Sequence, residues 1–382
     1  MRQTTLDLLY LSGCALNSVA PDAARVSAMD SEALLKEAER HKVAAVLAVA
    51  FEQLEDPAAV LGKEAWKQWH MVRNRALRRA LLFDTEREEI LSEMEKQGIW
   101  YLPLKGILVQ HYYPQYGMRE MADNDILIDE SKRKEMDAIM LGRGYTVERG
   151  LVHDEYLKEP LFNFEMHRRF FPKSSKLNQH FNVKQRGLLL KDEDREFGRH
   201  MRVEDLYSYV IAHAYKHYIH GGVGLKILMD SYVIRQKEKM DEAYLAAALD
   251  RMHIREFDAG IRTLGDHLFA HPETFSEEVL SESDRKMADY LAESGAYGTE
   301  ENSVLHSIQE LVDPDLENVT TSVKQKYVFR RLFPSFERMR IAYPVLEKWP
   351  VLLPAMYVVR WGKAMTKRAT EVRREIKAMR KL

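Results

Sequence analysis

The chain has 382 residues, of which 46% are hydrophobic and 30% charged, and its formal net charge at pH 7 is −2. Because one hydrophobic core stops growing efficiently near about 250–300 residues, we expect two or three packed regions. A net charge this close to zero argues against general nucleic-acid binding. The single cysteine, Cys14, excludes an internal disulfide and a cysteine-based zinc site.

Residues 1–98 are predicted to be helical. Residues 31–40 carry apolar side chains at helical spacing behind Ser31, a residue type that commonly caps helices. Residues 64–98 are predicted to form a long helix, because they contain no proline and no glycine before Gly98.

Residues 99–195 alternate short apolar runs with helical segments, a pattern typical of an α/β unit. Strands are predicted at residues 99–104, 125–128, 145–148, 155–157 and 161–169, and helices at 107–113 and 131–141, the second capped by Ser131. The roughly 90 residues of this pattern are too few for a complete dinucleotide-binding domain. Neither a GxGxxG nor a GxxxxGK[ST] phosphate loop occurs.

Residues 196–382 return to helical periodicity, with helices expected at residues 205–220, 225–237, 241–251 and 254–270. The tail from Lys363 to Leu382 is rich in Lys and Arg, so it is interpreted as a solvated terminal helix or as a segment that meets an anionic partner. We therefore expect three regions, at residues 1–98, 99–195 and 196–382.

The sequence shows neither a secretory nor a membrane-spanning pattern. The first 20 residues lack a basic start followed by an apolar run. The most apolar later stretch, residues 349–361, is short and interrupted by Pro350 and Pro354. A cytoplasmic protein without a membrane span is expected.

The segment from Arg119 to Asp129 is the most informative part of the chain. Asp123 and Asp125 stand two positions apart at the start of an apolar strand, so both carboxylates are expected on one face. Two anions this close repel each other unless a cation lies between them. Mg²⁺ is a hard ion that accepts carboxylate and phosphate oxygens. A turn that precedes a strand is the alternative interpretation.

Glu165 offers a third carboxylate. Residues 162–167 alternate apolar and polar side chains, which places Glu165 and His167 on one face of a strand. An acid between Phe164 and Met166 is costly to bury without a partner. Three carboxylates around two divalent ions would suit a two-metal displacement at phosphorus. The alternative is that Glu165 and His167 form an internal ion pair on the sheet.

Taken in order, several short motifs resemble the uncharacterised nucleotidyltransferase family of the polymerase-β-like superfamily. They are Leu104-Lys-Gly, Tyr113-Pro, Arg119, Asp123-x-Asp125-Ile-Leu-Ile, Gly144-Tyr145, Phe164-Glu-Met-His, Ala212-His-Ala-Tyr-Lys-His and Leu225-Lys-Ile-Leu-Met-Asp. The resemblance implies an α+β fold: a small mixed β-sheet core flanked by an N-terminal helical region and a C-terminal helical domain.

The resemblance also implies an activity and its ions. A nucleoside monophosphate, AMP from ATP as the first expectation, would move to a hydroxyl of an unknown small-molecule or protein acceptor, with pyrophosphate released. Asp123 and Asp125 would hold both Mg²⁺ or Mn²⁺ ions. Glu165 would hold one ion and accept the proton of the attacking hydroxyl.

Four further residues would line the nucleotide site by the same resemblance: Lys105, Gly106, Arg119 and His167. Lys105-Gly106 stands where the superfamily usually has Gly-Ser, and Asn124 stands where many members have an apolar residue. The Lys-Gly turn favours a sensor that binds nucleotide without turnover, whereas the complete carboxylate trio favours an active enzyme.

The helical half adds polar candidates for the nucleotide or acceptor site. His213, Lys216 and His217 share one helix face. They could line the cleft, pack against another helix or bind a metal ion. The glutamate that follows the first histidine in zincin metalloproteases is missing here. Lys226 and Asp230 are four positions apart, so a surface ion pair is the alternative there. A metal phosphohydrolase built on His213, His217 and Asp230 is the third functional class considered.

Overall fold

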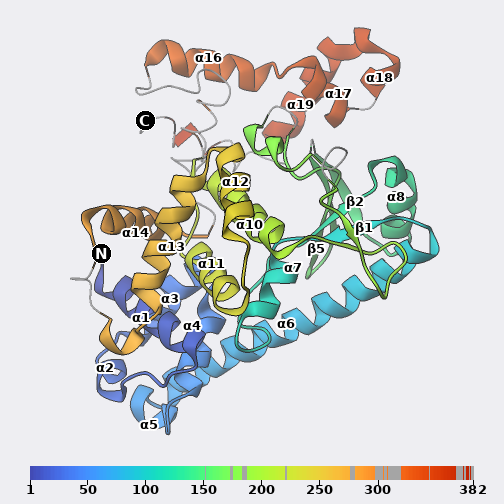
Figure 1. The fold of residues 1–382 in the computed structure, drawn as a ribbon. Helices are drawn as coiled ribbons and strands as arrows, with labels where there is room; N and C mark the ends of the chain where they lie inside the picture. The colour runs from blue at the N-terminus through green and yellow to red at the C-terminus, as the bar shows by residue number, and fades with distance from the viewer. Residues whose placement is uncertain are drawn as a thin grey trace.

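A computed structural model describes residues 1–150, 152–172, 175–182, 187–219, 222–275, 280–296, 320–343 and 345–366, together with isolated positions at 304, 308, 373, 376, 377 and 379. The colours of Figure 1 follow the chain from blue N-terminal helices through the green and cyan sheet region to orange and red helices. The fold is α+β, as the sequence predicted.

The N-terminal region is helical, as predicted. It contains α1 (Gln3–Asn17), α2 (Ala23–Ser27), α3 (Ser31–His41), α4 (Ala44–Glu52), α5 (Pro57–Leu61) and α6 (Lys63–Lys96). The 34 residues of α6 span about 51 Å at a rise of 1.5 Å per residue. In Figure 1 this helix extends from the other N-terminal helices to the sheet, so it connects the two parts.

The cap of α3 differs from the prediction. Asp30, not Ser31, is the capping residue, because its carboxylate accepts the backbone N–H of Ala33 at 3.0 Å. The Ser31 hydroxyl instead accepts the indole N–H of Trp69 at 2.9 Å. An aspartate directly before the serine is an equally good cap, and the serine is held by α6.

The sheet has five strands in the order β1-β2-β5-β4-β3. Their bounds are β1 (Tyr101–Pro103), β2 (Asn124–Ile128), β3 (Thr146–Arg149), β4 (His153–Lys158) and β5 (Phe162–His167). β2 and β5 run parallel, and the other neighbours run antiparallel, so the sheet is mixed. The predicted helix at 107–113 is a short α7 (Gly106–Val109) followed by the 3₁₀ turn η1 (Gln110–Tyr112).

The two faces of the sheet pack against different layers. Ile126, Ile128, Phe164 and Met166 belong to one apolar cluster that also contains Phe83 and other side chains of α6 and of α8 (Arg133–Gly142). Residues in alternate positions on a strand point to opposite faces. Asp125, Glu165 and His167 therefore lie on the other face, which is turned toward the C-terminal helices.

The start of α8 also differs from the prediction. Ser131 was expected to cap this helix, but it lies in the 3₁₀ turn η2 (Glu130–Lys132), and α8 begins at Arg133. Asp129 accepts the backbone N–H of Ser131 at 2.9 Å and its hydroxyl at 2.7 Å. Here too an aspartate takes the capping role, because its carboxylate directly precedes the turn.

The helices that follow the sheet agree with the predicted ranges. They are α10 (Val203–Tyr218), α11 (Lys226–Lys237), α12 (Glu242–Met252) and α13 (Arg255–Phe269). This part is completed by α14 (Glu282–Ser294), for which no range was predicted, by the short strands β6 (Leu190–Lys191) and β7 (Arg199–His200), and by the 3₁₀ turns η3 (Lys176–Gln179) and η4 (Pro272–Thr274). One continuous hydrophobic core contains side chains of α1, α4, α10, α11 and α13. The amide of Asn17 in α1 donates to the carbonyl of Phe269 at 2.7 Å. The N-terminal helix α1 therefore packs against α13, a helix far along the chain (Figure 1).

The last described helices lie at the top of Figure 1: α16 (Thr321–Leu332), α17 (Phe336–Ala342), α18 (Val345–Lys348), the 3₁₀ turn η6 (Pro350–Leu352) and α19 (Leu353–Thr366). The ring of Phe333 packs against Tyr357 and Trp361, at centroid distances of 5.4 and 5.3 Å, which joins the end of α16 to α19. Most of the predicted tail from Lys363 to Leu382 lies outside the described residues.

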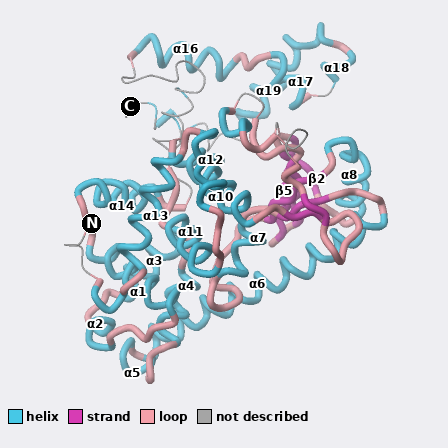
Figure 2. Tube along the Cα trace, in the orientation of Figure 1, coloured by secondary structure: helices cyan, strands magenta, loops and turns pink. Residues whose placement is uncertain are grey.

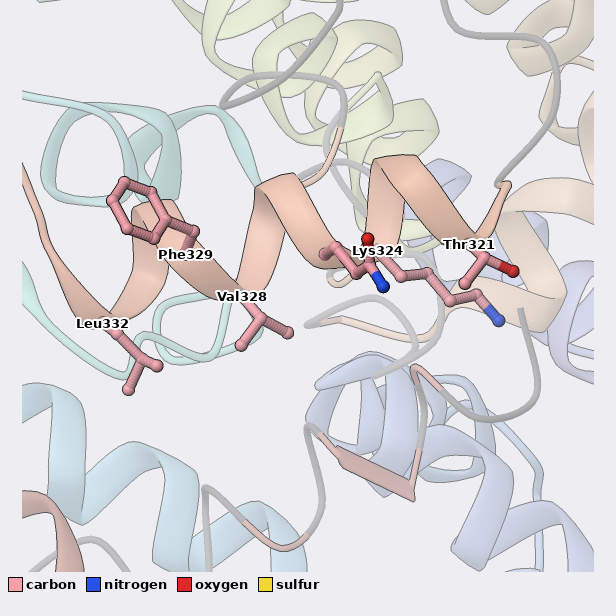
Figure 3. A pocket seen from close by; sticks show the side chains of 6 residues that line it. Thr321, Lys324, Val328, Phe329 and Leu332 are labelled. Carbon is pink, nitrogen blue, oxygen red and sulfur yellow. The ribbon is translucent and has the colours of Figure 1, made fainter.

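A shallow pocket of about 340 Å³ follows one side of α16. It is lined by Thr321, Lys324, Gln325, Val328, Phe329 and Leu332, side chains that project from one face of the helix in Figure 3. None of the predicted site residues lines it. Among the described residues, no helix has both the length and the apolar character needed to cross a membrane.

Candidate active site

Two of the three predicted carboxylates stand side by side on neighbouring strands. Asp125 in β2 and Glu165 in β5 are direct partners in the parallel pairing of these strands. Their side chains share one face of the sheet, as alternation requires. Asp125 is buried, whereas the side chain of Glu165 is 18% exposed. The strand register thus brings together acids that are 40 positions apart in the chain.

His167 contacts both carboxylates. Its Nε2 lies 2.8 Å from Oδ1 of Asp125 and 3.3 Å from Oε2 of Glu165. His153, in β4, is the cross-strand partner of His167, and its Nε2 lies 3.6 Å from Oε2 of Glu165. Sequence analysis missed His153, because the predicted strand at 155–157 began two residues too late. Residues 153–158 do not alternate in polarity, so no local pattern marked His153, and only the pairing of β4 with β5 places it at the site.

Asp123 lies directly before β2. Burial and the charge of Asp125 raise the pKa of its carboxyl to about 6. The loop that carries it is fixed from α6, because Arg79 donates to the carbonyl oxygens of Met121 at 3.0 Å and Ala122 at 3.2 Å. The first strand residue, Asn124, accepts a 2.8 Å hydrogen bond from Arg87 on the same helix. The long helix therefore holds the segment around both aspartates, through two backbone carbonyls and the side chain of Asn124.

Lys105 is not a surface lysine. Its ammonium lies 2.6 Å from Oδ1 of Asp125, and its side chain is 16% exposed. Burial opposes the charge, but Asp125 offsets this effect and raises the pKa of Lys105 above its usual value. Its φ of 46° lies in the left-handed region that side chains other than glycine rarely adopt. The backbone thus takes an energetically costly conformation at Lys105, the residue whose ammonium group contacts Asp125.

Gly106 is closely packed against two side chains. A Cβ atom at this position would collide with Nη1 of Arg119 and would lie 2.9 Å from the sulfur of Met121. A side chain at this position would force Arg119, which Asp230 holds in place, or Met121 to move. Both residues of the Lys-Gly turn are therefore constrained by the site, although their contact with a triphosphate remains a prediction.

Arg119 is bound to the helical half of the molecule. Its Nε and Nη2 donate to the two oxygens of Asp230 in α11, each at 2.8 Å, and Tyr113 donates to the same carboxylate at 2.7 Å. Lys226 does not pair with Asp230 on the helix surface. It donates to the carbonyl of Glu120 at 3.2 Å, and burial together with the charge of Arg119 lowers its pKa to about 8.

The residues predicted on α10 come to the sheet as well. Burial and the nearby charge of Lys105 lower the pKa values of His213 and Lys216. Nε2 of His213 lies 3.3 Å from Nε2 of His217. In Figure 2 the strands lie between α8 on one side and α10 on the other, so α10 covers the face that carries Asp125.

Nδ1 of His167 and the hydroxyl of Tyr209 are buried polar atoms at the site that have no hydrogen-bond partner in the structure. Tyr209 belongs to α10 and was not predicted as a site residue. Buried polar atoms are nearly always paired, so each exception requires an explanation. A bound ligand, ion or water molecule would supply these partners.

Comparison with known families agrees with this geometry. A family model described as "Uncharacterised nucleotidyltransferase" matches residues 27–270, which include all five strands of the large sheet and the helices as far as α13. The chain belongs to this nucleotidyltransferase family. Comparisons with curated proteins and with solved structures returned no match.

Membership in the nucleotidyltransferase family assigns the chain to the transferases at a general level. Within the described residues, one group has metal-ligand chemistry and spacing: the ligand atoms of His153, Glu165 and His167 all lie within 4.8 Å of one another. It shares only Glu165 with the predicted trio of Asp123, Asp125 and Glu165. The candidate site thus contains both oxygen and nitrogen atoms of the kinds that bind divalent ions.

Proposed function

We propose that this protein transfers a nucleoside monophosphate, AMP from ATP in the first instance, to a hydroxyl group of a small-molecule or protein acceptor and releases pyrophosphate. Family membership supports a nucleotidyltransferase, and the pairing of Asp125 with Glu165 is the observation that carries the catalytic assignment. A cytoplasmic location, where nucleoside triphosphates are available, is part of the same proposal.

The donor set fits a divalent cation. Asp123, Asp125 and Glu165 offer carboxylate oxygens, the ligands that Mg²⁺ and Mn²⁺ accept. Their mutual repulsion is visible in Asp123, where burial and Asp125 raise the pKa to about 6. When bound, such an ion would neutralise charge on the triphosphate and on the attacking oxygen.

The protein's own residues would perform the remaining steps. Glu165 is the more exposed carboxylate of the facing pair, so it is placed to accept the proton of the acceptor hydroxyl. Lys105 carries a positive charge at the same position and would compensate negative charge on the transferred phosphate. His213, Lys216 and His217 would line the nucleotide or acceptor side of the site from α10.

A nucleotide sensor without turnover is the second candidate. Lys105 and His167 both contact Oδ1 of Asp125, at 2.6 and 2.8 Å. This carboxylate therefore already has two partners that supply positive charge or a proton, as expected for a site that binds nucleotide without metal-dependent chemistry. The phosphohydrolase alternative lacks comparable support, because Asp230 is engaged by Arg119 and Tyr113.

Transfer is tested with ATP labelled separately at the α- and γ-phosphates. The purified protein is incubated with Mg²⁺ and with metabolite and protein fractions as acceptor sources. The proposal expects label from the α-phosphate in an acceptor, together with release of pyrophosphate. The rate of transfer should fall by more than about 100-fold in Asp125→Asn, because even the outer partners of metal ligands contribute about 10–100-fold.

The matched control is Glu130→Gln, which removes an exposed carboxylate just beyond β2 and should leave transfer unchanged. Nucleotide binding without transfer of either label supports the sensor. Release of free phosphate that survives Asp125→Asn and is lost in His217→Ala would place the chemistry on α10 and reject the transferase.

A further inference from the structure

We propose that His153, Glu165 and His167 form a binding site for a divalent ion of the first transition series, such as Mn²⁺, Co²⁺ or Zn²⁺, with a preference over Mg²⁺. The site deepens the proposed function, because it shares Glu165 with the predicted carboxylate trio. The binding of the ion itself can be measured without nucleotide.

The spacing of the three side chains matches that of metal ligands. Nε2 of His167 lies 3.3 Å from Oε2 of Glu165, and Nε2 of His153 lies 3.6 Å from the same oxygen. Ligand atoms that are about 2.1 Å from a tetrahedral ion are about 3.4 Å apart. Only small side-chain movements are therefore needed for one ion to reach all three residues.

The sheet fixes this arrangement in advance. His153 and His167 are direct partners in the antiparallel pairing of β4 and β5, and their ring centroids lie 4.8 Å apart. Glu165 is two residues before His167, so its side chain points to the same face. Ligands on paired strands are held more rigidly than ligands on loops. The site thus requires no ordering of the backbone when an ion binds.

Two imidazoles change which ion the site prefers. Mg²⁺ demands oxygen ligands in octahedral geometry, whereas imidazole suits the later ions of the first transition series. Three protein ligands leave coordination positions open for water or for a phosphate oxygen, as in catalytic rather than structural sites. The partly exposed side chains of His153 and Glu165, 35% and 18%, provide access from solvent.

The remaining contacts of His167 place the site beside the aspartates. The same Nε2 that faces Glu165 also lies 2.8 Å from Asp125. An ion held by the two histidines would therefore face Asp125 and Glu165 together. The nucleotide site would then contain a transition ion next to the position predicted for Mg²⁺.

The test uses the untagged, full-length protein stripped of metal and titrated with Co²⁺, whose visible absorption reports the ligands. We expect one equivalent to bind with an intense spectrum typical of four or five ligands that include nitrogen. Millimolar Mg²⁺ should not displace it. Pulsed paramagnetic resonance of bound Mn²⁺ should show coupling to imidazole nitrogen. A weak, octahedral all-oxygen spectrum, or displacement by Mg²⁺, would overturn the proposal.

The decisive variant is His153→Gln, which should weaken Co²⁺ binding by at least about tenfold, since a direct ligand contributes no less than the outer partners of metal sites. The side chain is partly exposed, so its replacement should leave the melting temperature nearly unchanged. His271→Gln is the matched control, because His271 also lies beside a glutamate, Glu273, at 3.3 Å but on the open surface. Equal binding by both variants would reject the site.

The outcomes separate this inference from the proposed transfer. Cobalt binding that persists while no acceptor is ever labelled rejects the transferase and keeps the metal site. Transfer with Mg²⁺ that is unchanged in His153→Gln, together with unaltered cobalt spectra, rejects the metal site and keeps the transferase.

Discussion

Arg119 and Asp230 are joined by two hydrogen bonds of 2.8 Å, although 111 positions separate them in the sequence. The pair is buried, with side chains 9% and 6% exposed. It connects the loop before β2 to α11, and Tyr113 donates a third hydrogen bond to the same carboxylate. The strand that carries Asp125 is thereby tied to the helices that cover it.

We expect Asp230→Asn to destabilise the protein, because it leaves the guanidinium of Arg119 buried without a counter-charge. Breaking a buried ion pair in this way costs about 3–5 kcal/mol. The free energy of unfolding measured by urea denaturation should fall by an amount in that range. The control, Asp266→Asn, removes the carboxylate of a more exposed pair with Arg235 and should cost about 0–1 kcal/mol. Similar losses in the two variants would show that burial is not decisive.

Replacement of Gly106 by alanine tests the close approach of α7 to Arg119. The added methyl group would collide with Arg119 and approach the sulfur of Met121. Overpacking of this kind costs about 1–3 kcal/mol, and displacement of Arg119 should also weaken nucleotide binding, as measured by calorimetry. Gly142→Ala is the control, because a methyl group there would have nothing within 4 Å and alanine favours a helix by about 0.5–1 kcal/mol. A neutral Gly106→Ala would contradict the packing argument.

Replacement of Arg87 by methionine tests how α6 supports the aspartates. The variant removes the donor to Asn124 and leaves a buried amide oxygen unpaired, which costs about 1–3 kcal/mol. Because Asn124 lies between Asp123 and Asp125, we expect transfer to fall by about 10–100-fold, the usual effect of losing an outer partner of a metal site. Arg78→Met, at an exposed position of the same helix, should retain full activity. Full transfer activity in both variants would show that Arg87 does not support the two aspartates.

Lys226 should make nucleotide binding depend on pH. Burial and Arg119 lower its pKa to about 8, so it loses its proton as the pH rises through that value. A bound triphosphate favours the charged ammonium, and binding near pH 8 should therefore take up a proton. Calorimetry in buffers of different ionisation enthalpy should detect this uptake in the wild type but not in Lys226→Met. Equal uptake in the two proteins would place Lys226 away from the phosphates.

The same shift has a consequence for stability. The unfolded chain keeps Lys226 protonated up to its ordinary pKa of 10.5, whereas the folded state releases the proton near pH 8. Stability therefore rises with pH between these values, because the unfolded state binds more protons there. The free energy of unfolding of the wild type should increase relative to Lys226→Met over this interval. A constant difference would contradict the lowered pKa.

The fold was predictable from local patterns to a large degree. Alternation along residues 162–167 correctly placed Glu165 and His167 on one face, and helical periodicity gave α10 to α13 within a few residues. These signals are carried by neighbours in the sequence, so one sequence suffices to detect them. The helix caps were less predictable, because an aspartate one or two positions before a serine offers the same hydrogen bond.

The parts that were missed depend on contacts between distant segments. His153 becomes a site residue only because β4 pairs with β5 at the register that joins it to His167. Arg119 finds its partner in Asp230 of α11, which is 111 positions away in the sequence. No local spacing encodes either relationship. The catalytic and binding roles of the predicted residues remain predictions that the experiments above test.

The contact of α1 with α13 has a consequence for synthesis on the ribosome. Asn17 is made early, but the carbonyl that it binds, on Phe269, is added 252 positions later. Until α13 has left the exit tunnel, the apolar side of α1 lacks part of its final cover, and long-range contacts of this kind form slowly. Chaperones that recognise exposed apolar helices would therefore meet the nascent chain for most of its translation.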